Sequence, residues 1–295
     1  MPPIKILLFC VCSTSFLQAL FDCGYPTKST AFAEYIARVV YPPKVFEDEY
    51  GGIVGKVMHE DDLAKHIAEG VTAKLNFDFA CHRGHGFGET YIHGVINEIL
   101  CARTMPNEQK IECGYPLPEI SNSKGRKKEI DFAVISPDEE KDHDKQDARC
   151  LKCAIEVKWA GSSHCDEKHI LSDLARLQWL FDKSPNVECF FVLSGHQNDV
   201  RNCFEKEDLL AKSTNKLLSI NRKRLLKSNW MNNFSLRDNN FHKKRLEELI
   251  SDLKSHNAWV LDSDRISTKL ISPRRLISKD ERFLTYVWEL TPLTH

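Results

Sequence analysis

Apolar residues that recur every three or four positions predict two helices in the middle of the chain. Within residues 88–103 these residues form one stripe: Ile92, Val95, Ile96, Ile99 and Leu100. Residues 169–181 repeat the pattern. Weaker periodicity also favours helices at residues 30–40, 60–71, 205–215 and 241–254. We therefore expect two central amphipathic helices, each with one buried face.

Short apolar runs bounded by turn-forming residues predict the strands. Five such runs lie at residues 111–115, 129–136, 151–159, 188–193 and 283–290. The charged segment 137–149 joins the second run to the third, which predicts a hairpin. The run at 283–290 and a shorter one at 259–262 would add strands at the sheet edges. The basic, Asn-rich segment 221–240 favours a loop.

The order of helix, three strands, helix and strand is typical of a mixed α/β sheet flanked by helices. With 295 residues, the chain is long enough for one large domain or two small ones. We expect a mostly helical region at 1–80, a core at 81–200 and a basic extension at 201–295. The extension could belong to the same domain as the core.

Composition is typical of a globular protein in a reducing compartment. Apolar residues make up 42% and charged residues 28% of the chain, which excludes disordered and fibrous classes. The 11 cysteines are an odd number, so we expect free thiols and a cytoplasmic location. No apolar run reaches the ~20 residues that span a bilayer, so no membrane partner is expected. Residues 4–12 favour a buried strand or helix over a signal peptide.

Charge is unevenly distributed, although the formal net charge is −1. Residues 1–200 hold 22 Lys and Arg against 30 Asp and Glu, whereas residues 201–295 hold 19 against 12. Residues 201–295 contain two basic clusters, which are Arg222, Lys223 and Arg224, and Lys243, Lys244 and Arg245. Basic side chains neutralise phosphates and the neighbouring aromatic residues can stack on bases, so the predicted partner is nucleic acid. The competing interpretation is a solvated helical face with the aromatic residues in the core.

Charged residues interrupt two apolar strands. Because side chains alternate along a strand, Glu156 and Lys158 share one face of 151–159, opposite its apolar residues. Asp131 lies opposite the apolar residues of 129–136 in the same way, and a hairpin would bring it beside Glu156. Two adjacent carboxylates repel unless a cation lies between them, and Mg²⁺ prefers such oxygen ligands. We therefore expect Mg²⁺ or Mn²⁺ here, with Lys158 beside a phosphoryl group or the attacking water.

The sequence Ile130-Asp131, then 24 residues, then Glu156-Val157-Lys158 resembles the PD-(D/E)XK superfamily, the restriction-endonuclease-like metal-dependent nucleases. The order of elements over roughly residues 88–195 is also similar. The chain departs from the family pattern in two ways, since Ile130 replaces the proline of the family name and the loop after the Asp strand is long. The resemblance implies a restriction-endonuclease-like fold. It also implies hydrolysis of phosphodiester bonds in nucleic acid, DNA in particular, by metal-activated water.

The resemblance also implies a role for each residue of the motif. Asp131 and Glu156 become metal ligands through their carboxylates, and Val157 becomes a ligand through its backbone carbonyl. Lys158 becomes the residue that positions the water or stabilises the transition state.

The two flanking helices would complete the site. Many members of the superfamily add a glutamate from the first core helix. We choose Glu89, at the edge of the apolar stripe, over Glu98, which lies opposite the stripe. In many members a polar residue of the following helix also faces the site, and Gln178 is our candidate. Asp173 and Arg176, three residues apart, are expected to form an ordinary surface pair.

Two other functions remain open. A chain with this fold could bind nucleic acid through its basic clusters without catalysis. Cysteine and histidine spacing also allows a zinc-stabilised interaction protein, with ligands among Cys150, Cys153, His164, Cys165 and His169. A nuclease core of this size is further compatible with a homo-oligomer or with a protein partner that supplies targeting.

Overall fold

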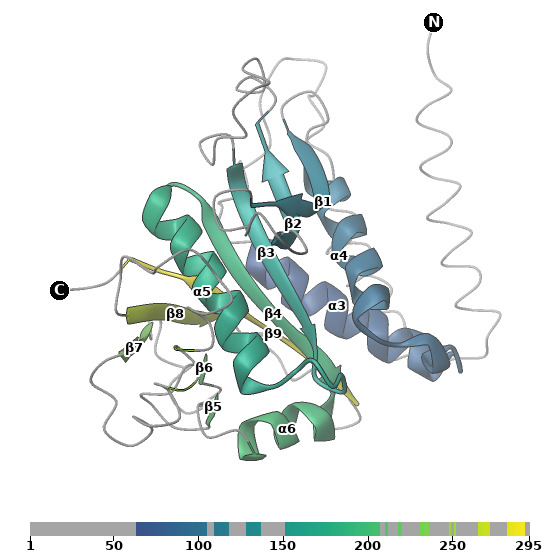
Figure 1. Ribbon diagram of the computed structural model, residues 1–295. Helices are drawn as coiled ribbons and strands as arrows, with labels where there is room; N and C mark the ends of the chain where they lie inside the picture. The colour runs from purple at the N-terminus through teal and green to yellow at the C-terminus, as the bar shows by residue number, and fades with distance from the viewer. Residues whose placement is uncertain are drawn as a thin grey trace, which may run out of the picture. The chain divides into compact units, whose positions relative to one another are not determined.

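Figure 1 presents a computed structural model of the chain. The residues described are 63–104, 109–117, 128–136, 151–206, 210–211, 218–219, 231–235, 248, 251, 265–271 and 282–292. They belong to one compact unit, Asp61–His295. The predicted helix at 30–40, the apolar segment 4–12 and the predicted strand at 259–262 lie outside the described residues. So does nearly all of the predicted helix at 241–254.

Seven strands form one mixed sheet (Figure 1). In spatial order they are β1 (Lys110–Pro116), β2 (Glu129–Ile135), β3 (Leu151–Trp159), β4 (Glu188–His196), β9 (Phe283–Leu290), β8 (Arg265–Ile271) and β7 (Met231–Ser235). Within this sheet β3 and β4 run parallel, and the other neighbours are antiparallel. Two short strands, β5 (Leu210–Ala211) and β6 (Leu218–Ser219), pair separately. The predictions of a mixed α/β sheet and of the hairpin between β2 and β3 are confirmed.

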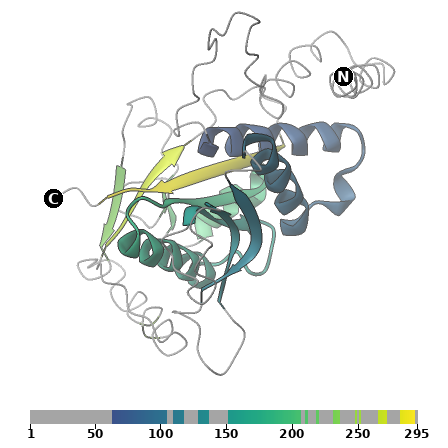
Figure 2. The same ribbon diagram turned by 90° about the horizontal axis from the view of Figure 1, so that it is seen from above.

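Helices cover both faces of the sheet (Figures 1 and 2). On one face lie α3 (Leu63–Ala80) and α4 (Glu89–Arg103), joined through the short helix η2 (Gly84–Gly86). On the other face lie α5 (Glu167–Lys183) and α6 (Gln197–Lys206). The apolar stripe predicted for α4 is buried as expected. Sheet and helices therefore form three layers, with one apolar core on each side of the sheet.

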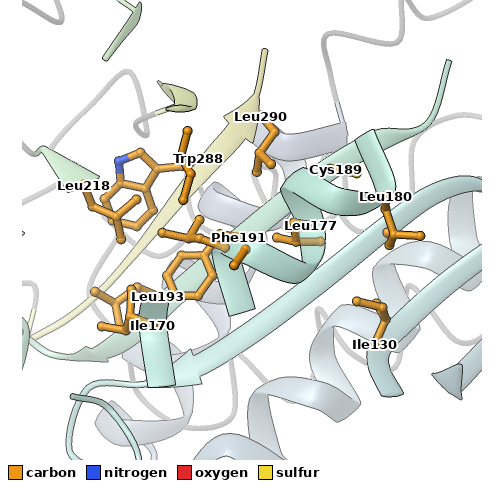
Figure 3. Packing of buried hydrophobic residues seen from close by; sticks show 14 of the residues in the cluster. Ile130, Ile170, Leu177, Leu180, Cys189, Phe191, Leu193, Leu218, Trp288 and Leu290 are labelled. Carbon is orange, nitrogen blue, oxygen red and sulfur yellow. The ribbon is translucent and has the colours of Figure 1, made fainter. Parts of the chain in front are cut away.

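The core on the α5 side is built from residues at helical spacing that meet alternating residues of the strands (Figure 3). On α5 the buried residues Ile170, Leu174 and Leu177 follow one another at intervals of four and three. They pack in one cluster with Phe191 of β4 and Trp288 of β9. This core fixes α5 against β4 and against β3, the strand that carries Glu156 and Lys158.

The last strand lies inside the sheet, so the prediction of an edge strand at 283–290 is wrong. β9 pairs with β4 on one side and with β8 on the other. Its neighbouring residues face opposite cores: Val287 lies in the α3 and α4 core, and Trp288 in the α5 core. A strand that is apolar on both faces is stable only when both faces are covered. Residues after 200 therefore complete the same sheet as the central strands.

Three local predictions also differ from the structure. The helix expected at 60–71 continues to Ala80, because Val71 and Leu75 keep its buried stripe going past Gly70. The helix expected at 205–215 is instead α6, which begins at Gln197 and is followed by β5. Residues 231–235, expected in a loop, form β7, which buries Phe234 beside β8. In β7, burial of Phe234 against the sheet outweighs the local preference for a loop.

Within the part of the chain that the structure describes, no helix combines the length and the apolar character needed to cross a bilayer.

Candidate functional site

Asp131 interrupts the alternation of β2. Ile130 packs in the α5-side core, whereas Phe132 packs in the α3 and α4 core, although residues two apart in a regular strand share a face. The Asp131 carboxylate accepts a hydrogen bond from the Val157 backbone N–H, with Oδ2 and N 2.7 Å apart. The side chain of Asp131 thus binds directly to the middle of the Glu156-Val157-Lys158 segment on β3.

Glu156 is a buried carboxylate with a specific cationic partner. Its side chain is 1% exposed, and its Oε1 atom accepts a hydrogen bond from Arg176 Nε at 2.9 Å and forms an ion pair with Nη2 at 2.8 Å. The same Nη2 atom lies 2.5 Å from Oδ1 of Asp173. The Arg176 guanidinium therefore links a carboxylate of β3 to a carboxylate of α5.

Lys158 is held by the other oxygen of Asp173. Its Nζ atom lies 2.8 Å from Asp173 Oδ2 and 3.4 Å from the carbonyl oxygen of Val157. The Lys158 side chain is 12% exposed, so the ammonium group is largely desolvated. Asp173 thus orients both cations of the site, Lys158 and Arg176, with one oxygen each.

The charged groups of the site shift one another's pKa values. Burial raises the pKa of Glu156 well above its usual range; the carboxylates of Asp173 and Asp131 raise it further, and Arg176 opposes them. Burial alone would lower the pKa of Lys158, but the carboxylates of Asp173, Glu156 and Glu89 together outweigh burial and raise it. Arg176 behaves in the same way, because Glu156 and Asp173 outweigh its desolvation and raise its pKa. Ionisable groups that perturb one another this strongly are typical of functional sites.

Asp173 and Arg176 are buried parts of this site, so the prediction of an ordinary surface pair is wrong. The Asp173 side chain is 5% exposed and that of Arg176 is 14% exposed. The sequence carries a signal for Asp173, because this residue lies at the edge of the buried stripe of α5, whereas Arg176 lies farther round the helix. Charged residues at the edge of such a stripe can reach the sheet on which the helix packs.

Helix α4 contributes further groups to the edge of the site. Glu89, half-buried in the first turn, is one of the carboxylates that raise the pKa of Lys158, whereas Glu98 is exposed and acts on Tyr91 instead. His93 lies one turn after Glu89 and was missed by sequence reasoning. Its Nε2 atom is 3.8 Å from Asp131 Oδ2, and the ring meets Phe132 edge to face.

Gln178 is oriented along its own helix. It is 1% exposed, and its Nε2 atom donates a hydrogen bond to Oδ1 of Asp182 at 2.7 Å. Among the described residues, the α5 side chains that contact Glu156 and Lys158 are those of Arg176 and Asp173, not that of Gln178. The structure therefore brings together Asp131, Glu156 and Lys158, with Glu89 nearby, and turns Gln178 toward Asp182.

The basic residues expected to bind nucleic acid lie outside the described residues. They are Arg222, Lys223, Arg224, Lys243, Lys244 and Arg245.

The candidate zinc ligands that can be placed have other neighbours. Cys153 is buried in the α3 and α4 core, and the Cys165 Sγ atom lies 3.5 Å from that of Cys203. The His164 and His169 rings contact one another edge to face, and His169 Nδ1 lies 2.7 Å from an Asp166 oxygen. Cys150 lies outside the described residues. Over the described ranges, no group of three or more His, Cys, Asp or Glu side chains is gathered closely enough to hold a metal ion.

The donor set nevertheless fits one hard divalent cation. Mg²⁺ is commonly held by one or two carboxylates, with waters and phosphate oxygens completing its shell, so three protein side chains are not required. The Asp131 carboxylate raises the pKa of Glu156, and the contacts described for Glu156 all involve Oε1. Two neighbouring carboxylates provide the oxygen ligands that such an ion prefers.

Comparison with known proteins returned no matching family model, no matching curated protein and no matching solved structure.

Proposed function

We propose that this chain is a metal-dependent nuclease that hydrolyses phosphodiester bonds of nucleic acid, with DNA as the favoured substrate. One observation carries the proposal: the Asp131 carboxylate is bonded to the backbone between Glu156 and Lys158. Two carboxylates and an ammonium group from two adjacent strands are thereby held together in a largely buried setting. That combination suits hydrolysis of a phosphodiester.

The similarity in element order also supports the proposal. Helix α4, strands β1 and β2, strand β3, helix α5 and strand β4 follow one another as in the PD-(D/E)XK superfamily. Asp131 lies on the second of these strands, and Glu156-Val157-Lys158 lies on the third. On this proposal the mixed sheet is a restriction-endonuclease-like core.

Each residue has a role that follows from its contacts. Asp131 and Glu156 would hold the divalent cation, with the Val157 carbonyl as a third ligand. When bound, the ion supplies a water of lowered pKa and polarises the phosphate. Lys158, fixed by Asp173, presents a positive charge beside the Val157 carbonyl, where it can stabilise the attacking water or a phosphate oxygen. Arg176 favours the ionised form of Glu156.

Replacement of Glu156 by Gln tests the proposal. The substitution keeps the size of the side chain and an acceptor for Arg176, but it removes the negative charge. We expect the wild type to cleave DNA with Mg²⁺ or Mn²⁺ and to stop when EDTA is added, and we expect E156Q to be inactive with either ion. The measurement is cleavage of linear duplex, circular duplex and single-stranded DNA, and of RNA.

Glu98→Gln is the matched control, because Glu98 is an exposed glutamate outside this ion network. Cleavage by E156Q at the wild-type rate would overturn the assignment. A wild type that binds DNA but cleaves no substrate would favour the alternative of an inactive binding module. In such a module the Arg176–Glu156 ion pair could stabilise the buried carboxylate without a metal.

The choice between the two glutamates of α4 can be tested in the same assay. We expect Glu89→Gln to lower the cleavage rate by about tenfold, because Glu89 contributes to the field around Lys158. Glu98→Gln should leave the rate unchanged. Equal cleavage rates for the two variants would show that Glu89 takes no part in the reaction.

A further inference from the structure

A guanidinium group occupies a position between two carboxylates in this site. Arg176 lies between Glu156 on β3 and Asp173 on α5, at 2.8 and 2.5 Å from one oxygen of each. A divalent cation shared by two carboxylates would lie between them and offset their negative charges in the same way. Arg176 is therefore a resident counter-ion on one side of Glu156, while Asp131 lies near Glu156 as its other acidic neighbour.

The net charge of the site favours the binding of one divalent cation but not of two. Asp131, Glu156 and Asp173 are acidic, whereas Lys158 and Arg176 are basic, so these five residues carry one negative charge in excess when all are ionised, without counting Glu89 at the edge of the site. One divalent ion makes it singly positive, which suits a phosphodiester. A second divalent ion would leave a strongly positive cluster and would lie against the guanidinium group.

We propose that the site takes one divalent ion and that Arg176 fills the position of a second. This inference rests on the proposed function, because it assumes that Asp131 and Glu156 hold the first ion. Arg176 acts here as a positioning residue: it excludes a second ion from the Glu156–Asp173 pair and keeps the two carboxylates in place. The fixed fork of the guanidinium group suits that task better than a flexible ammonium group does.

Titration with Mn²⁺ tests this inference without requiring catalysis. Bound and free Mn²⁺ are distinguished by electron paramagnetic resonance at one fixed neutral pH, and the ions still bound by Glu156→Gln are subtracted as background. We expect one ion per wild-type chain. Arg176→Gln should bind two, because Glu156 and Asp173 lose their shared counter-ion. Arg176→Lys, which keeps the charge, should bind one.

A double variant identifies the place of the second ion. Arg176→Gln combined with Asp173→Asn should return to one ion, since the second ion loses a ligand. Thermal melting establishes which variants are folded.

Several results would overturn the inference. Three of them would leave the proposed nuclease intact. They are two ions on the wild type, two ions on Arg176→Lys, and a single ion on folded Arg176→Gln. No Mn²⁺ on the wild type beyond the background would remove both this inference and the metal of the proposed function. If Arg176→Gln does not fold, two ions on the wild type or on Arg176→Lys would still overturn the inference.

Discussion

Lys158→Met is expected to slow DNA cleavage by about 10²–10³-fold, the usual cost of removing one preorganised charge from a transition state. The methionine side chain keeps most of the aliphatic volume of lysine in this largely buried position. It removes the ammonium group that lies 2.8 Å from Asp173 and beside the Val157 carbonyl. Cleavage rates at saturating Mg²⁺ measure the effect, and DNA binding in EDTA should change little.

Lys152→Met is the matched control for this prediction. Lys152 lies on the same strand as Lys158, where the pairing of β3 with β2 is irregular, and it is exposed. We expect its removal to leave the cleavage rate within about twofold of the wild type. Equal rates for the two methionine variants would mean that Lys158 has a purely structural role with Asp173.

Trp288→Ala is expected to lower the free energy of unfolding by about 3–5 kcal/mol, a large part of the ~5–15 kcal/mol typical of a domain. Trp288 is 1% exposed and lies on β9, between the rings of Phe191, Phe204 and Tyr286. Its removal leaves a cavity that neighbours on three elements cannot fill. Urea unfolding followed by circular dichroism measures the change.

Phe79→Ala provides the comparison, because Phe79 is 37% exposed. Its loss should cost about 1–2 kcal/mol, less than that of Trp288, since its ring is partly exposed and contacts the edge of the core around Phe283. A Trp288 variant as stable as the Phe79 variant would show that β9 is not part of the cooperative core.

The sequence predicts most of the central elements because local pattern and tertiary burial agree there. The stripe of α4 and the run that forms β3 show the period of the structure that they adopt, whereas the alternation predicted for β2 breaks at Asp131, where Ile130 and Phe132 lie in opposite cores. The pairing of β2 with β3 also follows, since the charged loop joins them. For the site, the same pattern places Asp131, Glu156 and Lys158 near one another.

Other features depend on contacts between distant segments, which a local pattern does not contain. The interior place of β9 is decided by β4 and β8, which lie far from it in sequence. The role of Arg176 is equally non-local. Arg176 lies three residues after Asp173 on one helix, which is the spacing of an ordinary surface pair. Because β3 packs against this helix, the pair is buried and Arg176 also bonds to Glu156.

The interior position of β9 has a consequence for the order of events during synthesis. Asn76 on α3 bonds to the backbone of Phe283, more than two hundred positions later, and β9 separates β4 from β8. The ribosome delivers α3, β3 and β4 long before β9 emerges, so the nascent chain holds β4 with one unpaired edge until residues 283–290 are free. A sheet with such long-range pairing closes slowly, and its open edge is prone to association with other chains. Chaperone contact during translation should therefore be concentrated on chains that end between β4 and β9.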